Sequence, residues 1–107
     1  MRVKVRAFGE LTPMLGDELT VELNEGASIS DLISKISSEI SGFKEKIKYL
    51  SSQQGVTDFG LVMLLNGVNI NLLEGTKTRL KDGDVVVILP PVAGGGSLTF
   101  RRLFLHL

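Results

Sequence analysis

The sequence predicts an α+β domain in which one main helix crosses one face of a mixed sheet of four to five strands. Apolar and polar residues alternate over residues 2–8 and again over 17–23, which is the period of half-buried strands. The apolar period changes to that of a helix over residues 28–40, and short apolar runs return at 60–70 and 84–89. Two strands, a helix and then more strands are typical of an α+β fold.

The first two strands are expected to pair as a hairpin with an irregular connection. Residues 2–8, "RVKVRAF", and residues 17–23, "DELTVEL", both alternate, and the segment between them holds two glycines and a proline. A loop or one short turn is therefore expected there. In the first strand the two faces differ in chemistry, with apolar Val3, Val5 and Ala7 opposed to basic Arg2, Lys4 and Arg6.

The main helix is expected to begin after Ser28, which can act as its N-cap with Asp31 as the acidic partner of a capping box. Gly42 is a plausible stop. A second short helix is expected over residues 43–50, and a loop over 51–58. The apolar stripe of the main helix consists of Ile29, Leu32, Ile33, Ile36 and Ile40.

The second half of the chain is expected to add three strands. The run "GLVMLLNG" ends in Asn66-Gly67, a dipeptide typical of a tight hairpin turn, and "VNI" follows as a brief strand. The last strand, "DVVVILPP", ends at Pro90 because proline has no N–H to donate to a ladder. The β-grasp fold has this order of elements.

Both faces of the last strand are apolar, which is unusual where a helix covers one face only. A central strand under flanking loops and a face that docks onto a partner both account for this pattern. The two sets of side chains are Val85, Val87 and Leu89 on one face, and Val86 and Ile88 on the other.

Composition excludes several kinds of chemistry. The 107 residues suit one domain, expected over 1–93, with a flexible glycine segment and tail at 94–107. The chain has no cysteine and a single histidine, His106, so thiol catalysis, serine–histidine catalysis and multi-histidine metal sites are not expected. All 12 acidic residues but only ten of the 12 basic ones precede Gly94, so the body carries a charge near −2. Neither a nucleic-acid partner nor a membrane is expected, and the cytoplasm is the expected location.

Three short motifs have competing interpretations. The run Gly94-Gly95-Gly96 lacks the lysine and the spacing of a phosphate loop, so it is either a linker or a segment that threads into a narrow tunnel of another enzyme. Asp82 and Asp84 flank a glycine and are interpreted as turn formers rather than a metal site. The alternate lysines of the second helix are interpreted as solvated surface, namely Lys44, Lys46 and Lys48.

A predicted β-grasp domain followed by "PPVAGG" resembles the small, sulfur-carrying subunit of molybdopterin synthase, and is similar to the related archaeal ubiquitin-like modifiers. The resemblance covers residues 1–95, with "MRVKVRAFGEL", "LLNGVNI" and "LKDGDVVVILPPVAGG" as its segments. It implies a carrier subunit without catalytic side chains of its own. Members of that family end at the second glycine, here Gly95, which follows Gly94.

The resemblance also implies the chemistry and the partners. An E1-like enzyme uses ATP to adenylate the Gly95 carboxylate, which then becomes a thiocarboxylate and supplies sulfur inside the large subunit of the synthase. No cofactor is expected on this chain itself. Family partners contact a hydrophobic surface of the sheet, and the matching positions here are Phe8, Leu73, Leu89, Val92 and Ala93. For Phe8, Leu73 and Leu89 the alternative is that they belong to the core.

The chain departs from that family by continuing past Gly95 as "GSLTFRRLFLHL". A protease that exposes Gly95, a tail foreign to the native protein, and a copy that no longer carries sulfur are the alternatives. An amphipathic stripe, Phe100, Leu103, Phe104 and Leu107, predicts a short helix that shields the apolar patch near Leu89. A protein modifier, joined to lysines through the same glycine, is the alternative function. A plain interaction module is the third.

Overall fold

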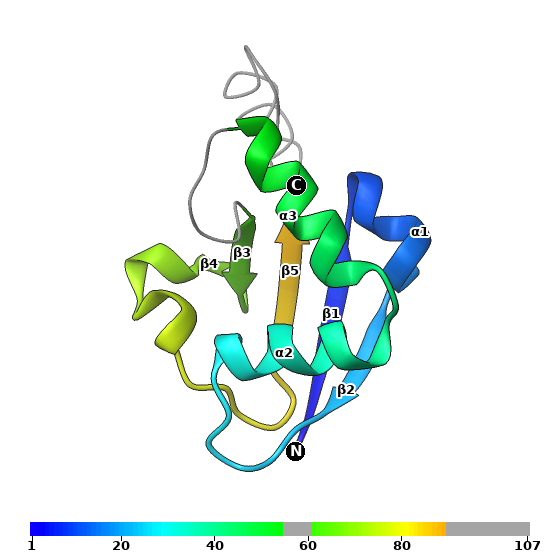
Figure 1. Ribbon diagram of the computed structural model, residues 1–107. Helices are drawn as coiled ribbons and strands as arrows, with labels where there is room; N and C mark the ends of the chain where they lie inside the picture. Colours follow the sequence, from blue (N-terminus) through cyan, green and yellow to red (C-terminus); the bar gives the residue numbers. More distant parts are fainter. Residues whose placement is uncertain (55–60, 90–107) are drawn as a thin grey trace.

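The computed structural model describes residues 1–54 and 61–89, and within them it contains a mixed sheet with helices on one face (Figure 1). The strands are β1 (Arg2–Ala7), β2 (Leu19–Glu22), β3 (Val62–Leu65), β4 (Val68–Asn69) and β5 (Val85–Leu89). The helices are α1 (Thr12–Leu15), α2 (Ile29–Glu39) and α3 (Phe43–Gln54). Three short 3₁₀ turns, η1 (Gly9–Leu11), η2 (Ile70–Leu72) and η3 (Gly75–Lys77), complete the elements.

The five strands lie in the order β2-β1-β5-β3-β4, so the last strand of the described chain is central. β5 pairs in parallel with β1 and antiparallel with β3. The predicted mixed sheet and its first hairpin, β1 with β2, are confirmed. The connection of that hairpin holds η1 and α1, where a loop or one short turn was expected.

The hydrophobic core lies between the helices and one face of the sheet. Val3 and Val5 of β1 and Val86 of β5 are fully buried there, against the apolar stripe of α2. Phe43 and Ile47 attach α3 to the same core, and both are buried. Every buried residue of this cluster lies between Val3 and Ile88. Leu89, the last residue of β5, is buried as well.

The predicted capping box begins α2. The Ser28 backbone N–H and hydroxyl both donate to Asp31 Oδ2, at 2.9 and 3.1 Å, and the Asp31 N–H donates to Ser28 Oγ at 3.3 Å. These bonds satisfy donors that the first helical turn leaves open. The hydrogen bond from the Ser28 backbone, followed by that from its side chain and the charge of Arg79, lowers the pKa of Asp31 from its ordinary value of 3.8.

Two boundaries were predicted wrongly. Residues 51–54 were expected in a loop, but α3 continues through them to Gln54. Serine and glutamine do not break a helix, and the first glycine after the start of α3 is Gly55. Ile70 was expected in a strand, but it begins η2, where the side chain of Asn69 accepts the N–H of Asn71 at 2.9 Å. This local hydrogen bond competes with the sheet ladder.

The Asn66-Gly67 turn is confirmed, with both residues in the left-handed region at φ 50° and 87°. Leu65 and Val68 face each other across it. The turn interpretation of "KDGD" also matches the hydrogen bonds, because Asp84 Oδ2 accepts the N–H of Lys81 and Asp82 Oδ1 accepts the N–H of Arg2, both at 2.7 Å. These carboxylates serve the backbone rather than a metal.

Candidate docking face and carboxyl-terminal segment

The face of the sheet opposite the helices is the candidate docking face, defined by Arg2, Lys4, Arg6, Val62, Leu64, Val85 and Val87. Its three basic side chains are exposed, and its four apolar side chains are half-buried. The strand register places Arg6 beside Val87 and Val87 beside Leu64, so one row crosses three strands from a cation to an apolar centre. A patch of this kind is suited to binding a partner.

Arg6 and Phe8 are in contact at one end of this face. The guanidinium carbon of Arg6 lies 5.9 Å from the centroid of the Phe8 ring, which is within the range of a cation–π interaction. The Phe8 N–H donates to the Ile88 carbonyl at 3.3 Å, so this residue is held beside the end of β5. Phe8 itself is half-buried.

The three predicted contact residues do not form one exposed patch. Phe8 lies beside the end of β5, and Leu89 is the last residue of that strand. Leu89 is only 3% exposed, whereas Leu73 is 45% exposed. Leu73 follows η2, beyond the edge strand β4, so the three strands β5, β3 and β4 separate it from β1. The structure therefore brings Phe8 and Leu89 together but not Leu73.

The predicted reactive terminus falls outside the described residues. This applies to Gly94 and Gly95, to Val92 and Ala93, and to the stripe predicted in the tail. Gly95 lies six positions after Leu89 in the chain. A chain of that length spans at most about 20 Å. Whatever acts on Gly95 must therefore work within that distance of the end of β5.

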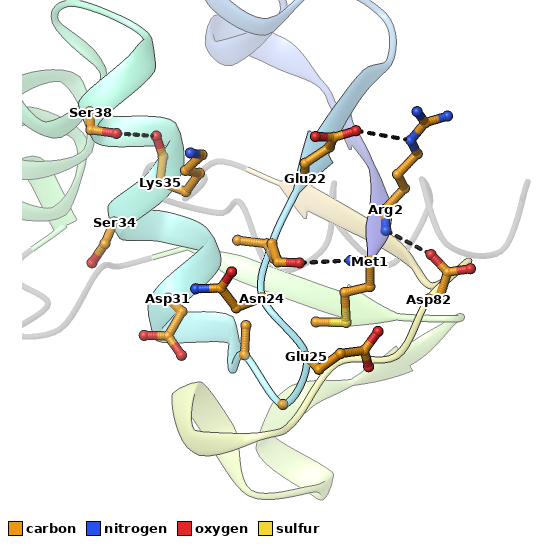
Figure 2. A pocket seen from close by; sticks show the side chains of 13 residues that line it. Met1, Arg2, Glu22, Asn24, Glu25, Asp31, Ser34, Lys35, Ser38 and Asp82 are labelled. Carbon is orange, nitrogen blue, oxygen red and sulfur yellow. Dashed lines mark hydrogen bonds and ion pairs between the residues drawn. The ribbon is translucent and has the colours of Figure 1, made fainter.

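A polar depression near the amino terminus is lined by groups that mostly bind one another (Figure 2). The Met1 ammonium donates to the Leu23 carbonyl at 2.8 Å, and Arg2 Nε lies 3.1 Å from Glu22 Oε1. Lys35, at its rim, forms an ion pair with Glu39 at 3.3 Å. The first two contacts fasten the amino-terminal end of β1 to the end of β2 and the residue after it, and the third lies within α2, so all three have a structural role.

Within residues 1–54 and 61–89, no group of three or more histidine, cysteine or acidic side chains is placed to hold a metal ion. No helix in the same residues is long and apolar enough to cross a membrane.

Sequence reasoning missed the basic half of the candidate docking face. The alternation of "RVKVRAF" did place Arg2, Lys4 and Arg6 on one side of a strand. It did not show that β5 pairs in parallel with β1 and so puts Val85 and Val87 next to those cations. The signal was the basic alternation itself, and the pairing was needed to interpret it.

Comparison with known proteins gives the family. The model described as the ThiS family matches residues 5–95. The chain belongs to the ThiS family. The match covers β1 from Val5, every later described element, and the glycine pair, and it ends at Gly95.

Two curated relatives of this ThiS-family chain are matched along their whole length. The chain is 27% identical over 96 residues to small archaeal modifier protein 3 of Haloferax volcanii, which covers 89% of this chain and 100% of that protein. It is 32% identical over 95 residues to the sulfur carrier protein CysO of Mycobacterium tuberculosis, again 89% of this chain and 100% of the relative.

Solved structures share the fold. The solution structure of the Haloferax volcanii protein HVO 2177 has a TM-score of 0.70 at 26% identity, covering 89% of this chain and 87% of that one. A putative molybdopterin converting factor subunit 1 from Pyrococcus furiosus has a TM-score of 0.62 at 32% identity, covering 86% and 99%. A chain of the BexX/CysO complex of Amycolatopsis orientalis has a TM-score of 0.62 at 28% identity, covering 87% of this chain and 99% of that one. The predicted β-grasp fold is confirmed by these neighbours.

Proposed function

We propose that this chain is a sulfur carrier, the small subunit of molybdopterin synthase, and that its reactive group is the carboxylate of Gly95. The observation that carries the proposal is the ThiS-family match, which ends at the second glycine of "PPVAGG". The CysO relative is named as a sulfur carrier, and the Pyrococcus furiosus neighbour as a molybdopterin converting factor subunit.

The chemistry requires activation before sulfur can be added. A free carboxylate, with a pKa near 3.5, is ionised at neutral pH and resists attack by a nucleophile. An E1-like enzyme joins one Gly95 oxygen to the α-phosphorus of ATP and releases pyrophosphate. Hydrosulfide, HS⁻, then attacks the carbonyl carbon, AMP leaves with the oxygen that joined it, and a thiocarboxylate remains after loss of a proton. Since the chain has no cysteine, it cannot carry the sulfur as a persulfide on a thiol side chain. The terminal carboxylate is the position that the proposal assigns to it.

The geometry supports a division of labour between this chain and its partners. β5 is central to the sheet, and the chain leaves its end toward Gly95 next to Phe8 and the candidate docking face. Glycine has no Cβ, so a Gly-Gly end fits a narrow tunnel and keeps its carboxylate open to attack. The catalytic side chains come from the adenylating enzyme and from the large subunit of the synthase. The BexX/CysO complex of Amycolatopsis orientalis is an example of a CysO protein bound to another protein.

Residues 96–107 lie beyond the family match and must be removed before Gly95 can react. A protease that cuts after Gly95 therefore belongs to the proposed sequence of reactions. Its product is a chain of residues 1–95 that retains every buried residue the structure describes, the last of which is Leu89.

A second candidate function is protein modification. The relative that favours it is small archaeal modifier protein 3, which the chain matches along the full length of that protein. In this case the activated Gly95 carbonyl forms an isopeptide bond with a lysine amine of another protein, and AMP leaves. Both functions require the same adenylation.

The test compares a chain ending at Gly95 with one ending at Gly94, using the E1-like enzyme of the source organism and ATP. The longer chain is expected to support exchange of pyrophosphate with ATP, and the shorter one is not. Equal exchange by both chains would show that Gly95 is not the activated residue. Mass spectrometry of the native protein then separates the candidates. A chain ending at Gly95 with one oxygen replaced by sulfur supports the carrier, and lysine-linked conjugates support the modifier.

A further inference from the structure

We propose that Lys4 and Arg6 select an acidic surface on the partner. The candidate docking face then binds the adenylating enzyme through aspartate or glutamate side chains of that enzyme, placed beside the apolar centre of this face. This inference rests on the proposed function for the identity of the partner. Its basis is the charge pattern of the face, which the family match does not supply.

The face is basic on a chain whose body is not. Residues 1–93 carry a charge near −2 because all 12 acidic residues lie there with ten basic ones. On the strands of the candidate docking face the balance is reversed, with Arg2, Lys4 and Arg6 from β1 and a single acid, Glu22, from β2. Glu22 is already paired with Arg2 at 3.1 Å.

Lys4 and Arg6 are therefore the cations available to a partner. Both are exposed, and neither forms an ion pair within the described residues. The register places Lys4 beside Val85 and Arg6 beside Val87, so both cations stand at the rim of the apolar row. Charges at the rim of an apolar interface help to select the partner and raise the rate of association.

Arg6 is also held in place before a partner arrives. Its guanidinium lies over the Phe8 ring, 5.9 Å from the centroid, which limits the conformations of a long side chain. Binding then loses less side-chain entropy than it would with a free arginine. Phe8 and Arg6 form one unit, an apolar ring with a cation above it, next to the strand that leads to Gly95.

The same charges disfavour two other occupants. A symmetric dimer through this face would place two basic surfaces in one interface, and like charges repel. The tail of the chain was predicted to cover this region, but it carries Arg101 and Arg102 and no acid. An acidic protein surface is the occupant that neutralises the face.

The experiment measures binding of the E1-like enzyme to the full chain by titration calorimetry at 50 mM and 500 mM NaCl. The double variant Lys4→Glu with Arg6→Glu is expected to bind about tenfold more weakly at low salt, with the difference shrinking at high salt. The matched control, Lys44→Glu with Lys48→Glu, makes the same charge change on exposed positions of α3 and is expected to bind as the unmodified chain does. Lys4→Arg keeps the charge and should keep the affinity.

Thermal unfolding of each variant separates an effect on binding from an effect on folding. If the double variant is destabilised, Lys4→Gln takes its place in the binding measurement. Equal affinity of the double variant and the control overturns the acidic-partner inference, as does a stable dimer of the unmodified chain that the double substitution disrupts. The proposed function has its own readout. Tight, salt-sensitive binding without ATP–pyrophosphate exchange by the chain ending at Gly95 overturns the function alone. Exchange that needs Gly95 but ignores Lys4 and Arg6 overturns this inference alone.

Discussion

The side-chain amide of Asn66 joins the β3–β4 turn to the start of β5. Asn66 Oδ1 accepts the N–H of Val85 at 2.9 Å, and Asn66 Nδ2 donates to Asp84 Oδ1 at 3.0 Å. The backbone of Asn66 is left-handed, at φ 50°, a conformation that asparagine adopts more readily than other residues with a side chain. One residue thus closes a hairpin and fixes the strand that leads toward Gly95.

Asn66→Ala is expected to lower the free energy of unfolding by about 2 kcal/mol, because it removes two hydrogen bonds and leaves alanine in a left-handed conformation. Asn66→Gly removes the same hydrogen bonds but tolerates the backbone, so it should be less destabilising. Urea denaturation measures both. Equal losses would mean that the backbone conformation contributes little.

The capping box of α2 gives a prediction in two parts. Ser28→Ala is expected to lower stability by about 1 kcal/mol, the usual cost of losing an N-cap side chain. Since hydrogen bonds from Ser28 lower the pKa of Asp31 below 3.8, the ionised carboxylate stabilises the fold above that pH. This contribution is lost as the pH falls through the folded-state pKa. Asp31→Asn should therefore be less stable than the unmodified chain at pH 7, and the difference should shrink below pH 3.8. A difference independent of pH would contradict it.

Leu89 and Leu73 should respond differently to aspartate. Leu89 is 3% exposed, so Leu89→Asp buries a charge without a partner. We expect it to destabilise the domain by about 3 kcal/mol or more. Leu73 is 45% exposed, so Leu73→Asp should change stability by less than about 0.5 kcal/mol. Thermal unfolding compares them. If Leu73→Asp also weakens binding of the adenylating enzyme, the docking surface extends beyond β4.

Phe43 is expected to be essential for the attachment of α3. It is fully buried in the core cluster, so Phe43→Ala should cost about 3–5 kcal/mol. Leu72, which is 80% exposed, provides the control, and Leu72→Ala should be nearly neutral. Circular dichroism during denaturation measures both. A mild effect at Phe43 would show that α3 packs more loosely than the structure indicates.

Local sequence patterns determined most of the elements. The alternation of β1 and β2, the capping box at Ser28 and Asp31, and the Asn66-Gly67 turn depend on neighbours within a few residues, so the sequence alone predicts them. The end of α3 was missed because no residue between Phe43 and Gly55 breaks a helix. Where such a helix ends depends on packing against residues that are distant in the sequence.

The sequence by itself determined the α+β order, the glycine pair at the end of the family match, and the absence of thiol chemistry on the chain. Only the tertiary structure decided which residues meet across the sheet. The parallel pairing of β1 with β5 joins residues about 80 positions apart and sets Arg6 beside Val87, while Leu89 is buried and Leu73 is not. Alternation assigns a side chain to one of two faces, but it carries no information about which strand lies alongside, because pairing is fixed by the packing of the whole core.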